Sequence, residues 1–112
     1  MTARSLPDFE PFAARVASDN GPLVIQARGE LDLGTAPRLW DALAGVLDDN
    51  HGELVIDLEG VSFMDAQGIK ILVRALKHVE TNGGKLVLRS PQPPARRVLE
   101  LTGLDDYLTI EP

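Results

Sequence analysis

The residues that could do chemistry gather in the stretch VSFMDAQGIKIL, at residues 61–72. Its centre holds one carboxylate (Asp65), one amide (Gln67) and one glycine (Gly68) between a strand-like run and a helical pattern. Short turns from a strand into a helix often hold the working residues of α/β proteins. These three residues offer hydrogen bonds and close approach, and the turn has no nucleophile, histidine or metal cluster. These residue types alone leave the role of the turn open.

Asp65 and Gly68 differ in how well local structure explains them. Asp65 suits the N-cap of a helix, where its carboxylate accepts hydrogen bonds from free backbone N–H groups and lies at the positive end of the helix dipole. A glycine in the first helical turn, by contrast, costs about 1 kcal/mol relative to alanine. Gly68 therefore indicates close approach of another chain or ligand, or else tight packing against the sheet.

Other candidates for chemistry have simpler explanations. Asp57 lies in a predicted buried strand, like the phosphoacceptor of a receiver domain, but the sequence lacks the second acidic cluster that would hold magnesium. His51 and His78 have no Ser, Cys or second ligand at a recognisable spacing, so they predict neither a catalytic triad nor a metal site. We expect no enzymatic activity and no cofactor.

Composition sets the class of protein. The chain has 112 residues, 44% apolar and 25% charged, which predicts one globular domain over residues 1–112 with an irregular segment at 1–11. Its net charge of -6 argues against direct binding of nucleic acid. The absence of cysteine excludes disulfides and thiolate sites. Without a membrane-length apolar run or a signal peptide, we expect a cytoplasmic protein that is not inserted in a membrane.

The first half of the chain predicts a hairpin and a helix. Residues 12–18 and 23–30 alternate like strands on either side of the turn formers at 19–22, which is typical of an antiparallel pair. Thr35 can cap the following helix, and Trp40 lies on its apolar side, so we expect Trp40 in the core. This helix should end near residues 49–52.

The second half predicts strands that alternate with helices. The apolar run at 53–58 suits a buried strand, and a helix from Asp65 to residue 81 follows it. Its apolar face comprises Ile69, Leu72, Val73, Leu76 and Val79. The glycines at 83–84 end that helix, and a strand at 85–89 follows. The stiff connector SPQPP at 90–94, a short helix from Ala95 stopped by Gly103, and a last strand at 107–110 complete the order ββαβαβαβ, an α/β fold with a mixed sheet.

The predicted second helix also carries a basic stripe, Lys70, Arg74 and Lys77, on its polar face. A solvated helix face explains such a stripe on spacing alone. In an acidic chain, however, a local basic stripe beside a helix start could also pair with the carboxylates of a partner.

Three stretches resemble the STAS domains, and most closely the single-domain anti-sigma factor antagonists of bacteria: GELDLGTAP (29–37), LVIDLEGVSFMDAQGIKIL (54–72) and LELTGLDDYLTI (99–110). The resemblance implies a mixed sheet with helices packed on one side. It also implies a binding protein for an anti-sigma factor that is itself a serine kinase. Such binding frees the sigma factor, and phosphorylation of a serine or threonine in a DSSG turn reverses it.

Carried onto this sequence, Asp65 matches the acidic residue of that turn and Gly68 matches its glycine. The switched hydroxyl falls on Gln67, which has none, and the residue before it is Ala66. The resemblance therefore implies an antagonist that phosphorylation does not switch at this position. It is then fixed in its binding state, or controlled by abundance, a ligand or a competing partner.

The resemblance also extends the expected partner surface and leaves alternatives open. Asp32, in GELDLGTAP, matches a family position near the partner, and we extend the surface to Lys70 and Arg74. STAS-like domains also serve as accessory subunits of membrane transporters and as small-ligand sensing modules, which are the alternative functions. The oligomeric state remains open.

Overall fold

The structure, a computed structural model, describes residues 12–18, 21–48 and 52–112. In these residues it confirms the predicted order ββαβαβαβ and adds one short 3₁₀ helix before the last strand. The elements are β1 (Ala13–Ser18), β2 (Leu23–Leu31), α1 (Ala36–Leu47), β3 (Glu53–Met64), α2 (Ala66–Thr81), β4 (Lys85–Arg89), α3 (Pro93–Thr102), η1 (Leu104–Asp106) and β5 (Thr109–Glu111).

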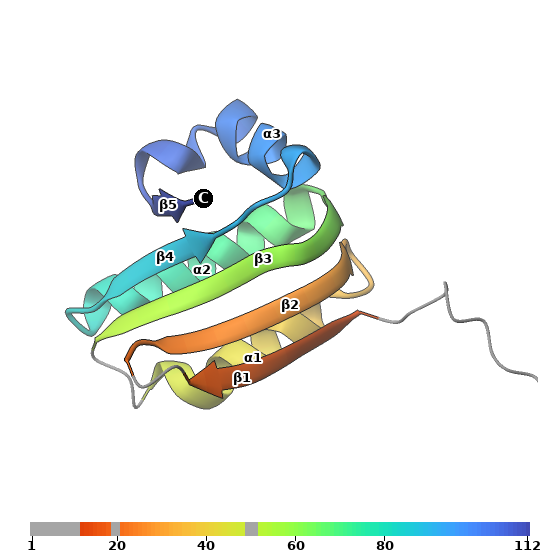
Figure 1. Cartoon of the computed structure of the whole chain (residues 1–112). Coiled ribbons are helices and arrows are strands. Elements are labelled where there is room, and N and C mark those ends of the chain that lie inside the picture. The colour runs from red at the N-terminus through yellow and green to blue at the C-terminus, as the bar shows by residue number, and fades with distance from the viewer. Residues whose placement is uncertain (1–11, 19–20, 49–51) are drawn as a thin grey trace, which may run out of the picture.

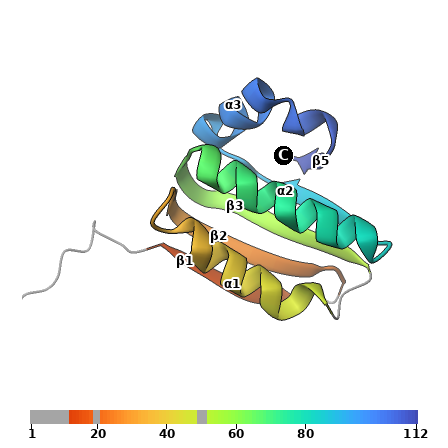
Figure 2. The same cartoon turned by 180° about the vertical axis from the view of Figure 1, so that it is seen from behind.

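The strands form one mixed sheet in the sequential order β1-β2-β3-β4-β5. The β1–β2 hairpin is antiparallel, as predicted, and the remaining neighbours are parallel. Parallel neighbours require crossover connections, which are right-handed in nearly all proteins, so successive helices fall on the same face. Figures 1 and 2 show α1 and α2 side by side on one face of the sheet, with α3 near the β5 edge.

The main core lies between the sheet and the helices, and α3 contributes Ala95 and Leu99 to it. In α2 the buried residues are Gly68, Leu72, Ala75 and Val79, whereas Ile69, Val73 and Leu76 of the predicted apolar face are half-buried. The buried face is therefore rotated from the predicted one. Two of its four residues, Gly68 and Ala75, are small, which lets the helix come close to the strands.

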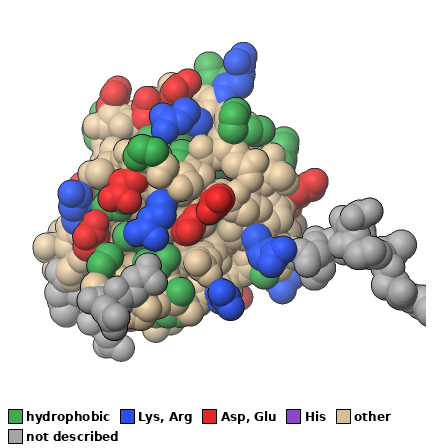
Figure 3. Space-filling view, viewed as in Figure 1, with side chains coloured by type: hydrophobic (Ala, Val, Ile, Leu, Met, Phe, Trp, Pro, Cys, Tyr) green, Lys and Arg blue, Asp and Glu red, His purple; other side chains and the backbone are tan. Residues whose placement is uncertain are grey.

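The opposite face of the sheet carries rows of charge (Figure 3). Strand register places a polar row across all five strands: Arg15, Gln26, Asp57, Arg89 and Glu111. Arg15 Nε donates a hydrogen bond to Gln26 Oε1 at 3.1 Å, and Arg89 pairs with Glu111 at 3.6 Å. The adjacent row, Val24, Val55 and Val87, is at most 1% exposed although neither α1 nor α2 covers this face. Long polar side chains bury apolar surface in this way.

The predicted strand at 53–58 is too short, because β3 continues to Met64. Register shifts lie between Gln26 and Arg28 and between Gly29 and Glu30 of the neighbouring β2, so pairing continues past each irregularity. Gly60 makes this possible. A Cβ atom at Gly60 would lie 2.8 Å from Arg28 Cβ and 3.1 Å from the carbonyl oxygen of Ala27.

Three further boundaries correct the prediction. Helix α1 ends at Leu47, before the expected 49–52, of which residues 49–51 lie outside the described part. Pro93 and Pro94 belong to α3 and not to a connector, since proline lacks the N–H that the first helical turn leaves unused. The last strand is Thr109–Glu111 because η1 occupies part of the segment before it. Gly103, with φ of 75°, ends α3 as predicted.

We expect Gly60→Ala to destabilise the fold by roughly 1–3 kcal/mol, because the added methyl group must push β2 and β3 apart. Gly45→Ala is the matched control, since its Cβ would meet no atom within 4 Å and the change removes a helix-weakening glycine from α1. Urea unfolding should show a lower midpoint for the first variant and an equal or higher midpoint for the second. Equal stability of the two variants would contradict the packing argument.

Candidate functional site

The two turns singled out by sequence lie side by side at the carboxyl ends of β2 and β3. Leu31 and Met64 are paired in the parallel register, and the backbone N–H of Asp65 donates to the carbonyl oxygen of Leu31 at 3.1 Å. The turn that leads into α1 and the turn that leads into α2 therefore share one end of the sheet (Figures 1 and 2). Ligands of α/β proteins commonly bind at this end of parallel strands.

Asp65 is the N-cap of α2, as predicted. Its Oδ1 accepts a hydrogen bond from the backbone N–H of Gln67 at 2.8 Å, and its carbonyl oxygen accepts from the N–H of Gly68 at 3.0 Å. One carboxylate therefore satisfies a free donor of the first turn and complements the helix dipole. Beside it, Ala66 is exposed and Gln67 is half-buried at the helix start.

Gly68 is buried, and packing against the sheet explains it. A Cβ at this position would lie 2.6 Å from Met64 Cγ and 2.9 Å from Leu31 Cδ2. Of the two explanations raised by the sequence, the structure supports tight packing, because the side of the helix that lacks a Cβ faces the core. Gly68 thus fixes the positions of the exposed Ala66 and the half-buried Gln67.

Asp32 organises the turn into α1, in which the sequence predicts a helix cap at Thr35. Asp32 Oδ1 accepts from the backbone N–H groups of Gly34 at 3.0 Å and Thr35 at 3.2 Å. Thr35 occupies the N-cap position but makes no side-chain cap hydrogen bond. Its hydroxyl donates instead to the carbonyl oxygen of Glu30 at 2.6 Å and accepts from the N–H of Asp32 at 2.9 Å. Thr35 is therefore the N-cap residue as predicted, but its side chain does not cap the helix because its hydroxyl ties the turn to the end of β2.

The basic residues of α2 are exposed, and Arg74 is held against α1. The guanidinium carbon of Arg74 lies 4.0 Å from the ring centroid of Trp40, a cation–π contact between the two helices. The ring of His78 lies 5.5 Å from the same indole. Trp40 is only half-buried, although it packs against the core as predicted. Lys70 is exposed one turn closer to the helix start.

Two exposed apolar side chains that sequence reasoning missed belong to the same end of the sheet. Leu33, in the turn after Asp32, is 72% exposed, and Phe63, next to Met64 in β3, is 45% exposed. Leu33 could have been noticed as an apolar residue between turn formers. We call the set Asp32, Leu33, Phe63, Asp65, Ala66 and Gln67 the carboxyl-end surface.

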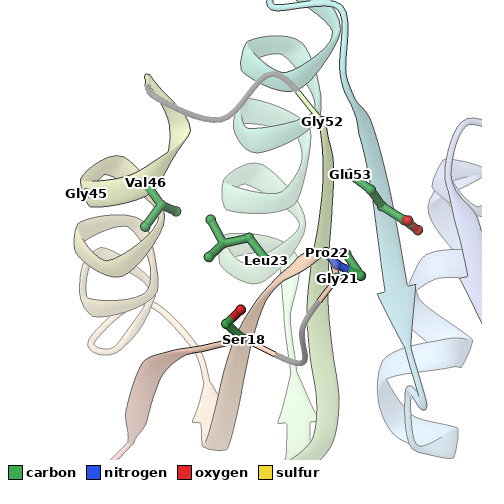
Figure 4. A pocket seen from close by; sticks show the side chains of 8 residues that line it. All are labelled: Ser18, Gly21, Pro22, Leu23, Gly45, Val46, Gly52 and Glu53. Atoms are coloured by element: carbon green, nitrogen blue, oxygen red, sulfur yellow. The ribbon is translucent and has the colours of Figure 1, made fainter.

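A hollow of about 380 Å³ lies at the other end of the sheet (Figure 4). In Figure 4 Leu23 and Val46 point toward one another while Glu53 points away, so the space between them is apolar. It is lined by Ser18, Gly21, Pro22, Leu23, Gly45, Val46, Gly52 and Glu53. This hollow brings together none of the predicted site residues.

Two features of the described residues concern metal sites and membrane spans. No group of three or more His, Cys, Asp or Glu side chains in these residues could hold a metal ion. No helix in the described part is long and apolar enough to cross a membrane.

The carboxyl-end surface combines two carboxylates, which bind local backbone N–H groups, with exposed apolar side chains.

Comparison with known proteins decides the family. The STAS domain family is matched over residues 13–112. The chain belongs to the STAS domain family. A relative from Mycobacterium tuberculosis, named anti-sigma-F factor antagonist RsfB, is 37% identical over 90% of this chain and 80% of that protein. An anti-sigma-B factor antagonist from Staphylococcus aureus is 31% identical over 77% of this chain and 80% of that protein.

The fold comparison agrees with the sequence comparison. The crystal structure of an anti-sigma factor antagonist from Mycobacterium paratuberculosis superposes with a TM-score of 0.80 at 35% identity. The match covers 97% of this chain and 91% of that one. The STAS fold expected from the sequence is therefore confirmed, including the mixed sheet and its order of elements.

The capping role of Asp65 in this STAS domain is testable without a partner. We expect Asp65→Ala to lower stability by about 1 kcal/mol, because the N–H of Gln67 loses its acceptor at the helix start. Asp65→Asn should retain most of that stability, since an amide oxygen also caps. Thermal or urea unfolding measures both, and an alanine variant as stable as the asparagine variant would contradict the assignment.

Proposed function

We propose that this STAS domain is an anti-sigma factor antagonist, and not an enzyme, that docks on its partner through the carboxyl-end surface. The observation that carries the proposal is the exposure of Leu33 and Phe63 at the carboxyl ends of β2 and β3, in the segments that lead into α1 and α2. Relatives of 31–37% identity that are named antagonists support the same function. They favour it over a transporter subunit or a small-ligand sensor.

The chemistry of this surface suits a protein partner. Exposed apolar side chains gain free energy when a partner covers them, and such residues at the centre of an interface carry most of the binding energy. Asp32 and Asp65 already bind backbone N–H groups of their own turns, so they hold the surface in shape. Lys70 and Arg74 lie along α2 from Gln67 and would form a charged rim for acidic groups of the partner.

Gln67 determines how the docking can be regulated. At the position that the family uses for its switched hydroxyl, this chain presents an amide, which does not accept a phosphoryl group. A phosphate there would add nearly two negative charges to the centre of the interface. We propose that the surface stays in its binding state with respect to phosphorylation at residue 67, and that binding frees the sigma factor held by the partner.

Leu33→Ser and Phe63→Ser should each weaken binding to the anti-sigma factor from the same genome by about tenfold or more, the effect of losing roughly 1.4 kcal/mol of interface energy. Titration calorimetry on the full chain measures the dissociation constants. The reason for the loss is that each change removes apolar area that the partner would cover.

Leu101→Ser and Tyr107→Ser are matched controls, because these side chains are 75% and 74% exposed but lie outside the carboxyl-end surface. Both controls should bind like the unmodified chain. Losses as large in the controls as in the test variants would place the partner elsewhere, and failure of the unmodified chain to bind any anti-sigma factor would overturn the function.

The role of Gln67 has its own test. Incubation with the partner and ATP should leave the intact mass of the unmodified chain unchanged, whereas Gln67→Ser should gain about 80 Da if the partner is a serine kinase. Gln67→Glu should weaken binding because it places charge at the interface, and Gln67→Asn is the neutral control. A mass gain in the unmodified chain would show that another residue is phosphorylated.

A further inference from the structure

We propose that β1 pairs edge to edge with β1 of a second copy of this chain, which makes a two-fold symmetric dimer with one continuous sheet. In the described part of the chain, β1 is hydrogen-bonded to β2 on one side only and forms an edge of the sheet. The backbone N–H and C=O groups on its outer side pair with no other described strand, so they can exchange solvent for a strand of a second molecule. The partner that offers both acceptors and donors at strand spacing is another strand.

The two edges of the sheet are built differently. Strand β5 has three residues and is followed by Pro112, and shortness and proline both protect an edge from further pairing. Strand β1 has six residues, Ala13–Ser18, and pairs with β2 in unbroken register without a bulge. It contains no proline and one charged residue, Arg15. Of the two sheet edges in the described residues, the one at β1 is therefore the better suited to pair with another strand.

Symmetry restricts how two such strands can pair. A two-fold axis perpendicular to the sheet makes the two β1 strands antiparallel. It also keeps each side chain on the same face of the joined sheet, so one residue of β1 must lie directly opposite its own copy, with the axis midway between them. An axis at Arg15 would set two arginines directly opposite one another, which destabilises a strand pair. An axis at Val16 instead pairs Val16 with its copy, Arg15 with Ala17, and Ala14 with Ser18.

The side chains fit the register centred on Val16. Val16 is paired with the core residue Ile25, so it points toward the helix-covered face, yet it is 50% exposed. Val16 is thus an apolar side chain at the sheet edge, half of whose surface is exposed in the single chain. Its neighbours Ala14 and Ala17 are small and half-buried. A second copy could approach closely and cover Val16 with the copy's own Val16.

The dimer would leave the carboxyl-end surface free. Strand β1 begins at that end of the sheet, since Ala13 pairs with Arg28 near the end of β2. Antiparallel pairing of two β1 strands places the two carboxyl-end surfaces at opposite ends of the joined sheet. The dimer would therefore present two independent docking sites, and its existence does not rest on the identity of their partner.

The chain has no cysteine, so single cysteines report the register directly. In Val16→Cys the two Cα atoms would lie about 4.5–5.5 Å apart, within disulfide range. Ala13 is an exposed position on the same strand. In Ala13→Cys the Cα atoms of the two copies would be offset by six residues along the strands, which is about 20 Å. Mild oxidation should convert the first variant largely to a covalent dimer and leave the second monomeric on a non-reducing gel.

Sedimentation of the unmodified full chain supplies the second measurement. We expect a species of twice the monomer mass whose share rises with concentration. Val16→Lys should abolish this species, because it places two ammonium groups at the axis. The circular dichroism spectrum of the variant should remain unchanged. A monomer at every concentration would overturn the proposal. So would equal oxidation of the Val16→Cys and Ala13→Cys variants, since random collisions would then explain the disulfides.

Discussion

The contact between Gly68, Met64 and Leu31 is the constraint on which the candidate site depends. A Cβ at residue 68 would stand 2.6 Å from Met64 Cγ, closer than nonbonded atoms allow, so the first turn of α2 rests directly on the ends of β2 and β3. The hydrogen bond from the Asp65 N–H to the Leu31 carbonyl holds the same junction through the backbone. A helix start in this position presents Ala66 and Gln67 outward while the helix axis is fixed by the core.

The two turns at this end of the sheet each use an aspartate to bind backbone N–H groups. Asp65 binds a free N–H of the first turn of α2, whereas Asp32 binds N–H groups of the two residues that precede α1. Asp32 Oδ1 accepts from Gly34 and Thr35, and Asp65 Oδ1 accepts from Gln67. The two carboxylates thereby become internal parts of the turns. What remains for a partner to contact is largely apolar or neutral.

Local chemistry explains which features the sequence could predict. The cap at Asp65 and the stop at Gly103 depend on neighbouring residues, so their positions were predictable. Thr35 occupies the N-cap position of α1, but its hydroxyl donates to the carbonyl oxygen of Glu30, a tertiary contact that the local pattern does not reveal. The extension of β3 depends on the contact of Gly60 with Arg28, far apart in sequence. The exposure of Phe63 likewise follows from the register shift after Gly29, which no local pattern encodes.

The charge already present at the start of α2 favours a neutral side chain at residue 67. The positive end of the helix dipole can stabilise an anion, but Asp65 already places a carboxylate there and binds the N–H of Gln67. A second anion in the same turn would meet that carboxylate, and its charge would have to be desolvated beneath a partner. Gln67 avoids both costs because it is polar and neutral. Under the proposed function, docking would depend on the exposed apolar side chains Leu33 and Phe63, and regulation would act on something other than the charge of residue 67.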